Sequence, residues 1–320
     1  MMNKVVLCIN VNACGNYLLP LLNHPDIIVH SDPRVLVVDG KTIRNFDYLV
    51  DCTIDGASSD WASFAEALGD RYIDVKRVSK ITQSLVLKRL GIPTPTFGFI
   101  PLQTTNAVSV HTICALADAM GFSTGDSIML KTINGARGMG QCVVKYDDLY
   151  RLANKHIGSD KEHLDFKDTW YELGGAEEDQ GQPITTTFLE YDTPYFLMSE
   201  FVDIVSEYRV LFNNAGVRLL SERTVKDKGS YQASAGTEPA DYTVVLPTEI
   251  RKWIEVLIEN IKLPFGSIDV YVDSDGKYGV LEYCTEFGYS DTPSILEIRN
   301  MTSDGLVSLI VNREKQLKEN

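Results

Sequence analysis

The sequence has no long apolar run and no excess of positive charge. No stretch approaches the roughly 20 consecutive apolar residues that a membrane helix needs. The formal net charge is −14 over 320 residues, which is the wrong sign for a protein that follows a nucleic-acid backbone or an anionic membrane surface. These features argue against nucleic acid or membrane as the main partner. A local cationic pocket for a small nucleotide remains compatible with an acidic chain.

Metal-binding cysteine motifs and a recognisable signal peptide are also lacking. The six cysteines form no C-x-x-C pair, and none is spaced from a histidine as zinc ligands are. The five histidines show no triad or ligand spacing either. The apolar core of MMNKVVLCINVN is too short for a secretory signal. We therefore expect a cytoplasmic protein whose cysteines are reduced, buried thiols.

The length of 320 residues is too great for one small core and indicates two or three lobes. Short apolar strands, among them VLVV, alternate with helical patterns at YLLPLLN and DWASFAEALGD, and they predict a small α/β domain over residues 1–77. A central unit is predicted over 78–194 and a carboxy-terminal unit over 195–320. Within the central unit, residues 158–194 are polar and contain glycine, and this length predicts a flap or an insertion with its own small structure.

Several elements have clear local signals. Ser79 is a predicted helix cap, and Gly91 is the predicted helix end, followed by prolines that force an extended exit. The segment TEIRKWIEVLIENI has the spacing of an amphipathic helix. FGSIDVYVD and KYGVLEYC are predicted strands joined by SDG, a hairpin signal. A closing helix is predicted over 304–320.

The glycine-rich stretch LKTINGARGMGQCVV runs from Leu130 to Val144. A dinucleotide loop would need a helix directly after it, and a Walker loop would end in Gly-Lys-Ser/Thr. Here the apolar stretches SIMLK and CVVKY flank the glycines, so we predict a hairpin tip. Its backbone N–H groups could fold over phosphates, with Lys131 as a nearby point charge. Taken alone, the stretch is equally compatible with a loose surface turn.

Other charged residues follow in a definite order. Lys80 precedes Pro93 by thirteen residues. Glu200 and Glu207 lie seven apart around a break between strands. Asp269 and Glu282, thirteen apart on adjacent hairpin strands, interrupt apolar sequence, where unpaired carboxylates are costly without a cation.

This ordered set resembles the ATP-grasp superfamily, and its last segment looks closest to the D-alanine–D-alanine ligase and ribosomal-protein glutamate ligase branches. The resemblance covers about residues 78–150 and 195–293. It implies an α/β (α+β) ATP-grasp fold, in which two lobes clasp ATP behind a small Rossmann-like amino-terminal domain.

The resemblance also implies residue roles. Lys80 and Lys131 match the phosphate-binding lysines, while Arg209 and Arg223 fall where the family places cations near the transferred phosphate or the substrate. The remaining nucleotide positions are the lid residues Gly135, Arg137, Gly138 and Gly140, the adenine-binding hinge Glu200, Phe201, Val202 and Asp203, and Glu207 on the ribose. Plainer interpretations stay open: Lys80 as a solvated lysine, Glu207 with Arg209 as a surface ion pair, and Arg223 in a solvated basic patch.

The implied metal is Mg²⁺, with Mn²⁺ as an alternative, held by Asp269 and Glu282. One position departs from the family pattern, because Cys284 stands where an asparagine usually serves a second metal. A thiol is a poor Mg²⁺ ligand. Strand alternation places Glu286 on the same face as Glu282, so Glu286 could supply the missing oxygen if the strand extends that far. Cys284 could instead simply pack beside the site.

The resemblance implies an ATP-dependent carboxylate–amine ligase that works through an acyl phosphate and releases ADP and phosphate. The expected substrates are amino acids or short peptides, and a homodimer is compatible with the family. A kinase or a carboxylate–thiol ligase would use the same nucleotide cradle. Because of Cys284, a nucleotide-binding regulator without turnover is a further alternative.

Overall fold

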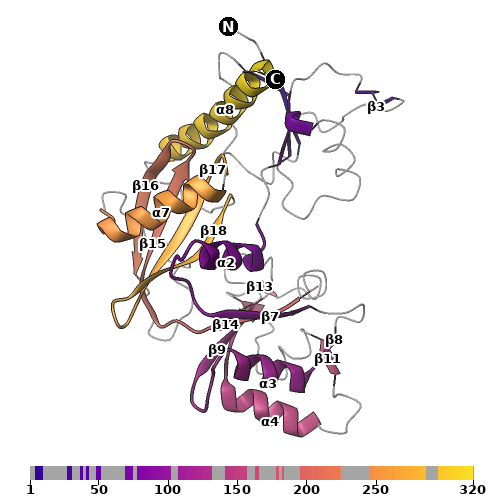
Figure 1. Cartoon of the computed structure of the whole chain (residues 1–320), viewed down its shortest axis with the longest axis vertical. Helices are drawn as coiled ribbons and strands as arrows, with labels where there is room; N and C mark the ends of the chain where they lie inside the picture. Colours follow the sequence, from indigo (N-terminus) through magenta and orange to yellow (C-terminus); the bar gives the residue numbers. More distant parts are fainter. Residues whose placement is uncertain are drawn as a thin grey trace.

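The computed structural model describes sixteen segments of the chain. They are residues 4–9, 27–30, 37–38, 41–42, 48–51, 69–74, 78–101, 107–131, 141–156, 163–165, 178–179, 182–183, 195–224, 245–261, 263–285 and 295–319. Three four-stranded sheets within these segments follow one another along the long axis of the molecule (Figure 1).

The amino-terminal sheet is parallel and has the strand order β2-β1-β5-β6. Its strands are β1 (Lys4–Ile9), β2 (Ile27–His30), β5 (Tyr48–Asp51) and β6 (Tyr72–Asp74). A parallel sheet of this kind agrees with the α/β pattern of the sequence. Of the strand predicted at VLVV, the structure describes β3 (Val37–Val38), which pairs with β4 (Lys41–Thr42) and not with the parallel sheet. The helix predicted over residues 17–23 lies outside the described segments. Of the helix predicted over 60–70, the described part is the beginning of a 3-10 turn, Gly69–Arg71.

The central sheet is antiparallel and has the order β10-β9-β14-β7. It consists of β7 (Phe97–Pro101), β9 (Ser127–Lys131), β10 (Gln141–Lys145) and β14 (Tyr195–Glu200). Helices α3 (Val110–Ala119) and α4 (Tyr146–His156) cover the face of this sheet that is turned away from the rest of the molecule (Figure 1). The β9–β10 hairpin confirms the predicted pairing around the glycine-rich stretch, whose tip lies outside the described segments.

The region predicted as a flap or insertion contributes short strands. β11 (His163–Asp165) pairs with β8 (Ala107–Ser109). β12 (Glu178–Asp179) pairs with β13 (Gln182–Pro183). The β12–β13 pair lies within the 158–194 region, whereas β11 joins that region to residues 107–109.

The carboxy-terminal sheet is antiparallel, in the order β16-β15-β17-β18. Its strands are β15 (Ile204–Asn213), β16 (Gly216–Thr224), β17 (Phe265–Asp273) and β18 (Tyr278–Cys284). Helix α7 (Thr248–Ile261) buries its apolar stripe against one face of this sheet. The predicted bounds of α7, β17 and β18 match closely, because each has a local period or turn signal.

Helix α2 (Lys80–Arg89) belongs to the same core although it precedes the central sheet in sequence. Leu87 packs with residues of α7 and of the carboxy-terminal sheet. The predicted cap is confirmed: the Ser79 hydroxyl accepts a hydrogen bond from the Thr82 N–H at 3.2 Å. The helix ends before Gly91, whose φ of +68° is a conformation that favours glycine.

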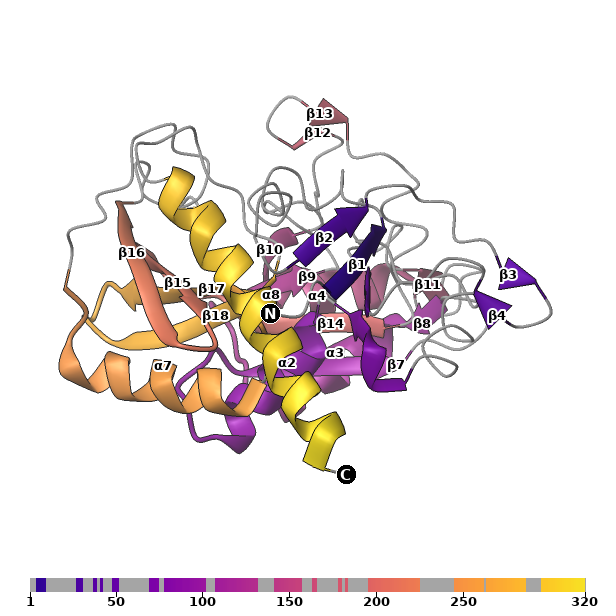
Figure 2. The same ribbon diagram turned by 90° about the horizontal axis from the view of Figure 1, so that it is seen from above.

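Helix α8 (Ile295–Glu319) begins nine residues before the predicted start at residue 304. It crosses from the carboxy-terminal sheet to the amino-terminal sheet (Figures 1 and 2). Near its end, Glu314 accepts a hydrogen bond from the Tyr48 hydroxyl at 2.7 Å, and Arg313 donates to the Tyr72 carbonyl at 2.8 Å. No helix in the segments listed above is both long and apolar enough to cross a membrane.

Gly305 provides a test of how closely α8 approaches the sheet. A Cβ atom at this position would collide with the Pro264 carbonyl oxygen. Alanine should raise helix propensity by about 1 kcal/mol, but overpacking against backbone costs about 1–3 kcal/mol. We therefore expect Gly305→Ala to lower the free energy of unfolding in urea. The exposed neighbour Asp304 offers a control, Asp304→Ala; a Gly305→Ala variant more stable than this control would contradict the close packing.

Candidate functional site

Three predicted site residues form a row across the carboxy-terminal sheet. Strand pairing sets Arg209 on β15 opposite Asp269 on β17, and Asp269 opposite Glu282 on β18. Directly opposed residues of antiparallel strands project from the same face. Val210 and Ile268, the chain neighbours of Arg209 and Asp269, point to the opposite face and pack in the core with α7. The charged row therefore lies on the face away from α7.

A β-bulge in β18 shifts the strand pairing at this row. Asp269 pairs with Glu282, but the next residue, Val270, pairs with Val280, so Leu281 is an extra residue. A bulge re-aims the side chains beside it and increases the local twist. The two predicted metal carboxylates lie on adjacent hairpin strands, as predicted, and the bulge makes them direct cross-strand neighbours, whereas the register of the turn alone would set Asp269 opposite Leu281.

Arg209 and Asp269 form a bidentate ion pair. Nε of Arg209 donates to Oδ1 of Asp269 at 2.8 Å, and Nη2 donates to Oδ2 at 2.6 Å. The side chains are only 13% and 6% exposed, so water screens the pair weakly. Burial alone would lower the pKa of Arg209, but the carboxylate of Asp269, followed by that of Glu207, raises it above its ordinary value.

Lys131 brings a second cation to the row from the central sheet. It is the last residue of β9. Burial lowers the pKa of its amino group, and the carboxylate of Glu282 offsets part of that shift. Charges from two separate sheets therefore act on each other across the space between them, where the resemblance expects the triphosphate.

Lys80 is the first residue of α2, and its Nζ atom is buried. The same helix is tied to β18 by Gln83, which is 4% exposed. The Gln83 side chain accepts from the Tyr283 N–H at 3.1 Å and donates to the Val78 carbonyl at 2.5 Å. Because Tyr283 follows Glu282 directly, this link fixes the position of Lys80, a predicted phosphate ligand, relative to Glu282, a predicted metal ligand. Sequence reasoning missed Gln83; its only signal was a polar residue among apolar helix positions.

Cys284 is the last residue of β18. Its sulfur lies 3.4 Å from the Ser267 hydroxyl oxygen. Burial, reinforced by Glu282 and Asp269, raises the pKa of the thiol to about 12, so it stays protonated and a poor Mg²⁺ ligand at neutral pH. Glu286, the proposed substitute, lies outside the described segments and stays a prediction.

Glu207 and Tyr271 occupy the next row on the same sheet face. Strand register pairs Glu207 with Tyr271 on β17 and with Arg223 on β16. Glu207 is 5% exposed, which does not suit a plain surface ion pair. A Cβ at Gly279 would collide with the Tyr271 ring, so this glycine makes room for the ring. Burial and then the Glu200 carboxylate raise the pKa of Tyr271 to about 12, which places Tyr271 near the hinge. Sequence reasoning did not identify it.

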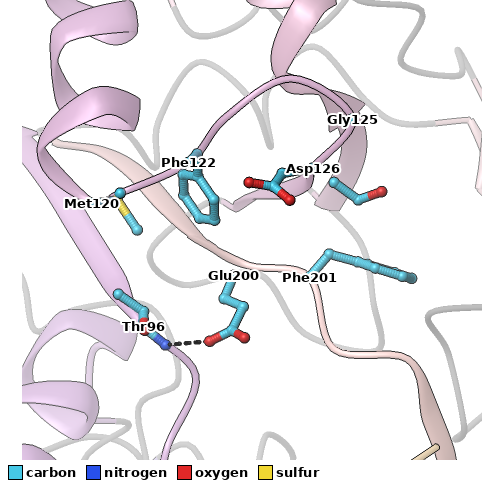
Figure 3. Close-up of a pocket in the computed structure, with 9 residues that line it drawn as sticks. Thr96, Met120, Phe122, Gly125, Asp126, Glu200 and Phe201 are labelled. Carbon is cyan, nitrogen blue, oxygen red and sulfur yellow. Dashed lines mark hydrogen bonds between the residues drawn. The ribbon is translucent and has the colours of Figure 1, made fainter.

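The predicted hinge begins where β14 ends. The Glu200 N–H donates to the Thr96 carbonyl at 2.7 Å, and the Glu200 carboxylate accepts from the Thr96 N–H at 3.1 Å (Figure 3). At the other end of the hinge, the Asp203 carbonyl accepts from the Ser274 N–H at 3.0 Å. These hydrogen bonds fasten residues 200–203 to β7 on one side and to the β17–β18 turn on the other.

A cavity of about 450 Å³ lies beside the hinge and is lined by Glu200, Phe201, Phe122 and Asp126, among others (Figure 3). It is located at the end of α3, and the charged row does not line it. The cavity thus borders the predicted adenine-binding hinge without including the predicted phosphate or metal positions.

The pair Asp269 and Glu282 fits a Mg²⁺ ion, which commonly binds through one or two carboxylates together with substrate phosphates and water. No group of three His, Cys, Asp or Glu side chains suited to a metal occurs among the residues that the structure describes. The lid residues Gly135, Arg137, Gly138 and Gly140 lie outside those residues, and their role stays a prediction.

Comparison with solved structures identifies the fold. D-alanyl-alanine synthetase A from Vibrio cholerae superposes with a TM-score of 0.58 at 16% identity, covering 98% of this chain and 99% of that one. The macrocyclase MdnC from Microcystis aeruginosa, bound with precursor peptide MdnA, gives 0.54 at 12% identity, with 95% and 99% covered. A RimK domain ATP-grasp protein from Sphaerobacter thermophilus gives 0.52 at 13% identity, with 95% and 97% covered.

No protein-family model and no curated protein sequence matches the chain. The structural matches extend over nearly the whole length of all three proteins. The described residues therefore form an α/β protein with three four-stranded sheets, in which a charged row on the carboxy-terminal sheet interacts electrostatically with Lys131 of the central sheet. Its fold is the ATP-grasp fold, as the order of motifs predicted.

Gln83→Leu tests the link between α2 and β18. The variant keeps an apolar volume but leaves the Tyr283 N–H and the Val78 carbonyl without their side-chain partner. Each buried unsatisfied group costs about 1–3 kcal/mol, so we expect unfolding in urea to become easier by at least about 1 kcal/mol. The Tyr283 amide should also exchange faster with deuterium. The exposed Lys88 of the same helix supplies the control Lys88→Leu; equal exchange rates in both variants would contradict the link.

Lys131→Met tests the buried amino group through pH dependence. Because burial lowers the folded-state pKa of Lys131, the unfolded chain holds this proton more tightly, with a pKa of about 10.4. Below that value the proton favours the unfolded state, so stability from this group rises as the pH rises toward it. Between about pH 8 and 10, we expect the unfolding free energy of the native protein to increase relative to that of Lys131→Met. A difference that stays constant in urea titrations over this range would count against a desolvated lysine.

Proposed function

We propose that the protein is an ATP-dependent carboxylate–amine ligase. The observation that supports this most directly is the charged row Arg209–Asp269–Glu282 on one sheet, with Lys131 of another sheet within electrostatic range of Glu282. Charges from two sheets of an ATP-grasp fold would then line one nucleotide cleft. Such a cleft suits a triphosphate, whose negative charges must be neutralised before an anionic carboxylate can approach it.

Each residue would act mainly through position and charge, as is usual in phosphoryl transfer. Lys80 and Lys131 would hold the phosphates from α2 and β9. Arg209 would stabilise the charge that develops on the transferred group. A bound magnesium ion supplies further charge neutralisation on the phosphates, and Asp269 and Glu282 are the residues that would hold it.

The proposed reaction has two steps that share this cleft. In the first, an oxygen of the substrate carboxylate attacks the γ-phosphorus of ATP, the bond to the β,γ-bridging oxygen breaks, and ADP leaves. In the second, an amine nitrogen attacks the carbonyl carbon of the acyl phosphate. The carbon–oxygen bond to the phosphate then breaks, inorganic phosphate leaves, and the nitrogen loses a proton to give the amide.

Amino acids or short peptides are the substrates that we propose. Two proteins of the same fold support this class by their names, since one is a D-alanyl-alanine synthetase and another is bound with a precursor peptide. The 158–194 region, which carries the short strands β12 and β13, is the candidate element for recognising the amine or the peptide.

A coupled ADP-release assay over amino acids and short peptides, with mass spectrometry of the products, tests the proposal. We expect ADP only when a carboxylate and an amine are both present, and a product equal in mass to the two less one water. Glu282→Gln should lower kcat on the order of 10²–10³-fold, because a charge contact in such a site is worth about 3–4 kcal/mol in the barrier. Asp275→Asn, 70% exposed on the same hairpin, should leave kcat unchanged.

The other outcomes separate the alternatives. A stable phosphorylated product formed without an amine would replace the proposal with a kinase. Binding of ATP that stabilises the protein but yields no ADP with any substrate pair would favour a nucleotide-binding regulator. A Glu282→Gln variant as active as Asp275→Asn would remove Glu282 from the site.

A further inference from the structure

One predicted metal carboxylate is paired with a cation of the protein. Both oxygens of Asp269 accept hydrogen bonds from the Arg209 guanidinium, at 2.8 and 2.6 Å. Glu282, the direct neighbour of Asp269 across β17 and β18, acts electrostatically on Lys131 of β9. Arg209 and Asp269, which the proposed function assigns to different ligands, are therefore paired with each other.

The Arg209–Asp269 pair is specific in geometry and weakly screened. A bidentate guanidinium–carboxylate pair is among the stronger charge-assisted contacts, and it engages one acceptor site on each carboxylate oxygen. The two side chains are 13% and 6% exposed, so water cannot readily replace either partner. A buried ion of this kind leaves its partner at low cost only when another charge takes the vacated place.

A divalent metal that approaches Asp269 meets the positive charge of Arg209 as long as the guanidinium stays there. Cys284 offers a thiol close to the Ser267 hydroxyl, and sulfur is a poor ligand for a hard cation. Among the residues that the structure describes, no alternative cluster of three potential ligands exists. Of the described carboxylates in the row, Glu282 is the other oxygen donor, and the charge of Lys131 acts on it.

We infer that Arg209 is the resident counter-cation of Asp269, which a divalent metal must displace, and that the displaced guanidinium then turns to the phosphates of the nucleotide. Metal and nucleotide therefore enter the cleft as one unit, and metal alone binds poorly. Arg209 is thus a specificity-determining residue that makes the metal site depend on the nucleotide. This inference rests on the proposed function, but its first test uses the metal without any nucleotide.

The first experiment measures Mn²⁺ binding to the full chain by electron paramagnetic resonance, with no nucleotide present. Arg209→Met removes the competing cation, so its affinity for Mn²⁺ should exceed that of the native protein at least about tenfold, as expected for loss of one close positive charge. Arg218→Met is a matched control, because Arg218 is an exposed arginine on the adjoining strand β16. Native-like affinity in Arg209→Met, or an equal gain in Arg218→Met, would overturn the inference.

The second experiment uses the native protein and does not depend on the folding of a variant. The Arg209 Nε–H, held in a buried pair, should give a slowly exchanging signal in nitrogen-15 spectra of arginine-labelled protein, assigned by its loss in Arg209→Lys. We expect this signal to persist with Mg²⁺ alone and to shift or lose its protection with Mg²⁺ and ADP together. If the Arg209 signal stays unchanged while other resonances report ADP binding, the inferred displacement of Arg209 from Asp269 is wrong.

The two experiments also separate this inference from the proposed function. If ADP perturbs no resonance at any concentration, the proposed function fails, whereas the Mn²⁺ comparison still decides whether Arg209 competes with a metal. If ADP binds and turnover occurs but Arg209→Met gains no Mn²⁺ affinity, the ligase proposal stands and the displacement of Arg209 is wrong.

Discussion

The balance of buried charge on one face of the carboxy-terminal sheet is the constraint on which the site depends. A carboxylate within an apolar sheet is costly unless a cation accompanies it, and Asp269 meets this requirement through Arg209, 60 residues away in sequence. That pairing exists only in one register of β15 against β17, since a slip of one residue would turn Arg209 to the face that packs on α7. The apolar core on one side and the ion pair on the other therefore select the same strand alignment.

Helix α2 is held in place by hydrogen bonds to β18, an edge strand of the same sheet. β18 is the last strand in the described order, and the N–H groups of an edge strand need partners. The segment from α2 onward supplies two of them, the Gln83 side chain for Tyr283 and the Pro93 carbonyl for Val280 at 2.8 Å. Closing this edge draws α2 into the core of the carboxy-terminal lobe and carries Lys80 with it. The helix thus belongs by sequence order to one lobe and by packing to the other.

Local signals in the sequence were sufficient for much of the fold. The placement of Asp269 and Glu282 on adjacent strands of one hairpin was predictable from the SDG turn signal, whereas their direct pairing was not, because it depends on the bulge at Leu281. The row that joins Arg209 to Asp269 was not, because strand pairing across 60 residues leaves no local trace. The start of α8 was missed for a related reason. Met301, Thr302 and Ser303 are buried together, so tertiary packing rather than an apolar period extends that helix toward its amino terminus.

Cys284 shows how the charge balance and the metal site constrain each other. An asparagine at this position would bring a hard oxygen to the row, whereas the thiol lies beside Ser267 and has a pKa raised to about 12 by burial. The described row thus offers a metal two carboxylates, of which Asp269 is paired with Arg209 and Glu282 lies within electrostatic range of Lys131. A site with few oxygen donors gains most from the oxygens of a bound phosphate. The substitution at position 284 and the Arg209–Asp269 pair therefore act in the same direction, since both leave a metal dependent on the nucleotide that arrives with it.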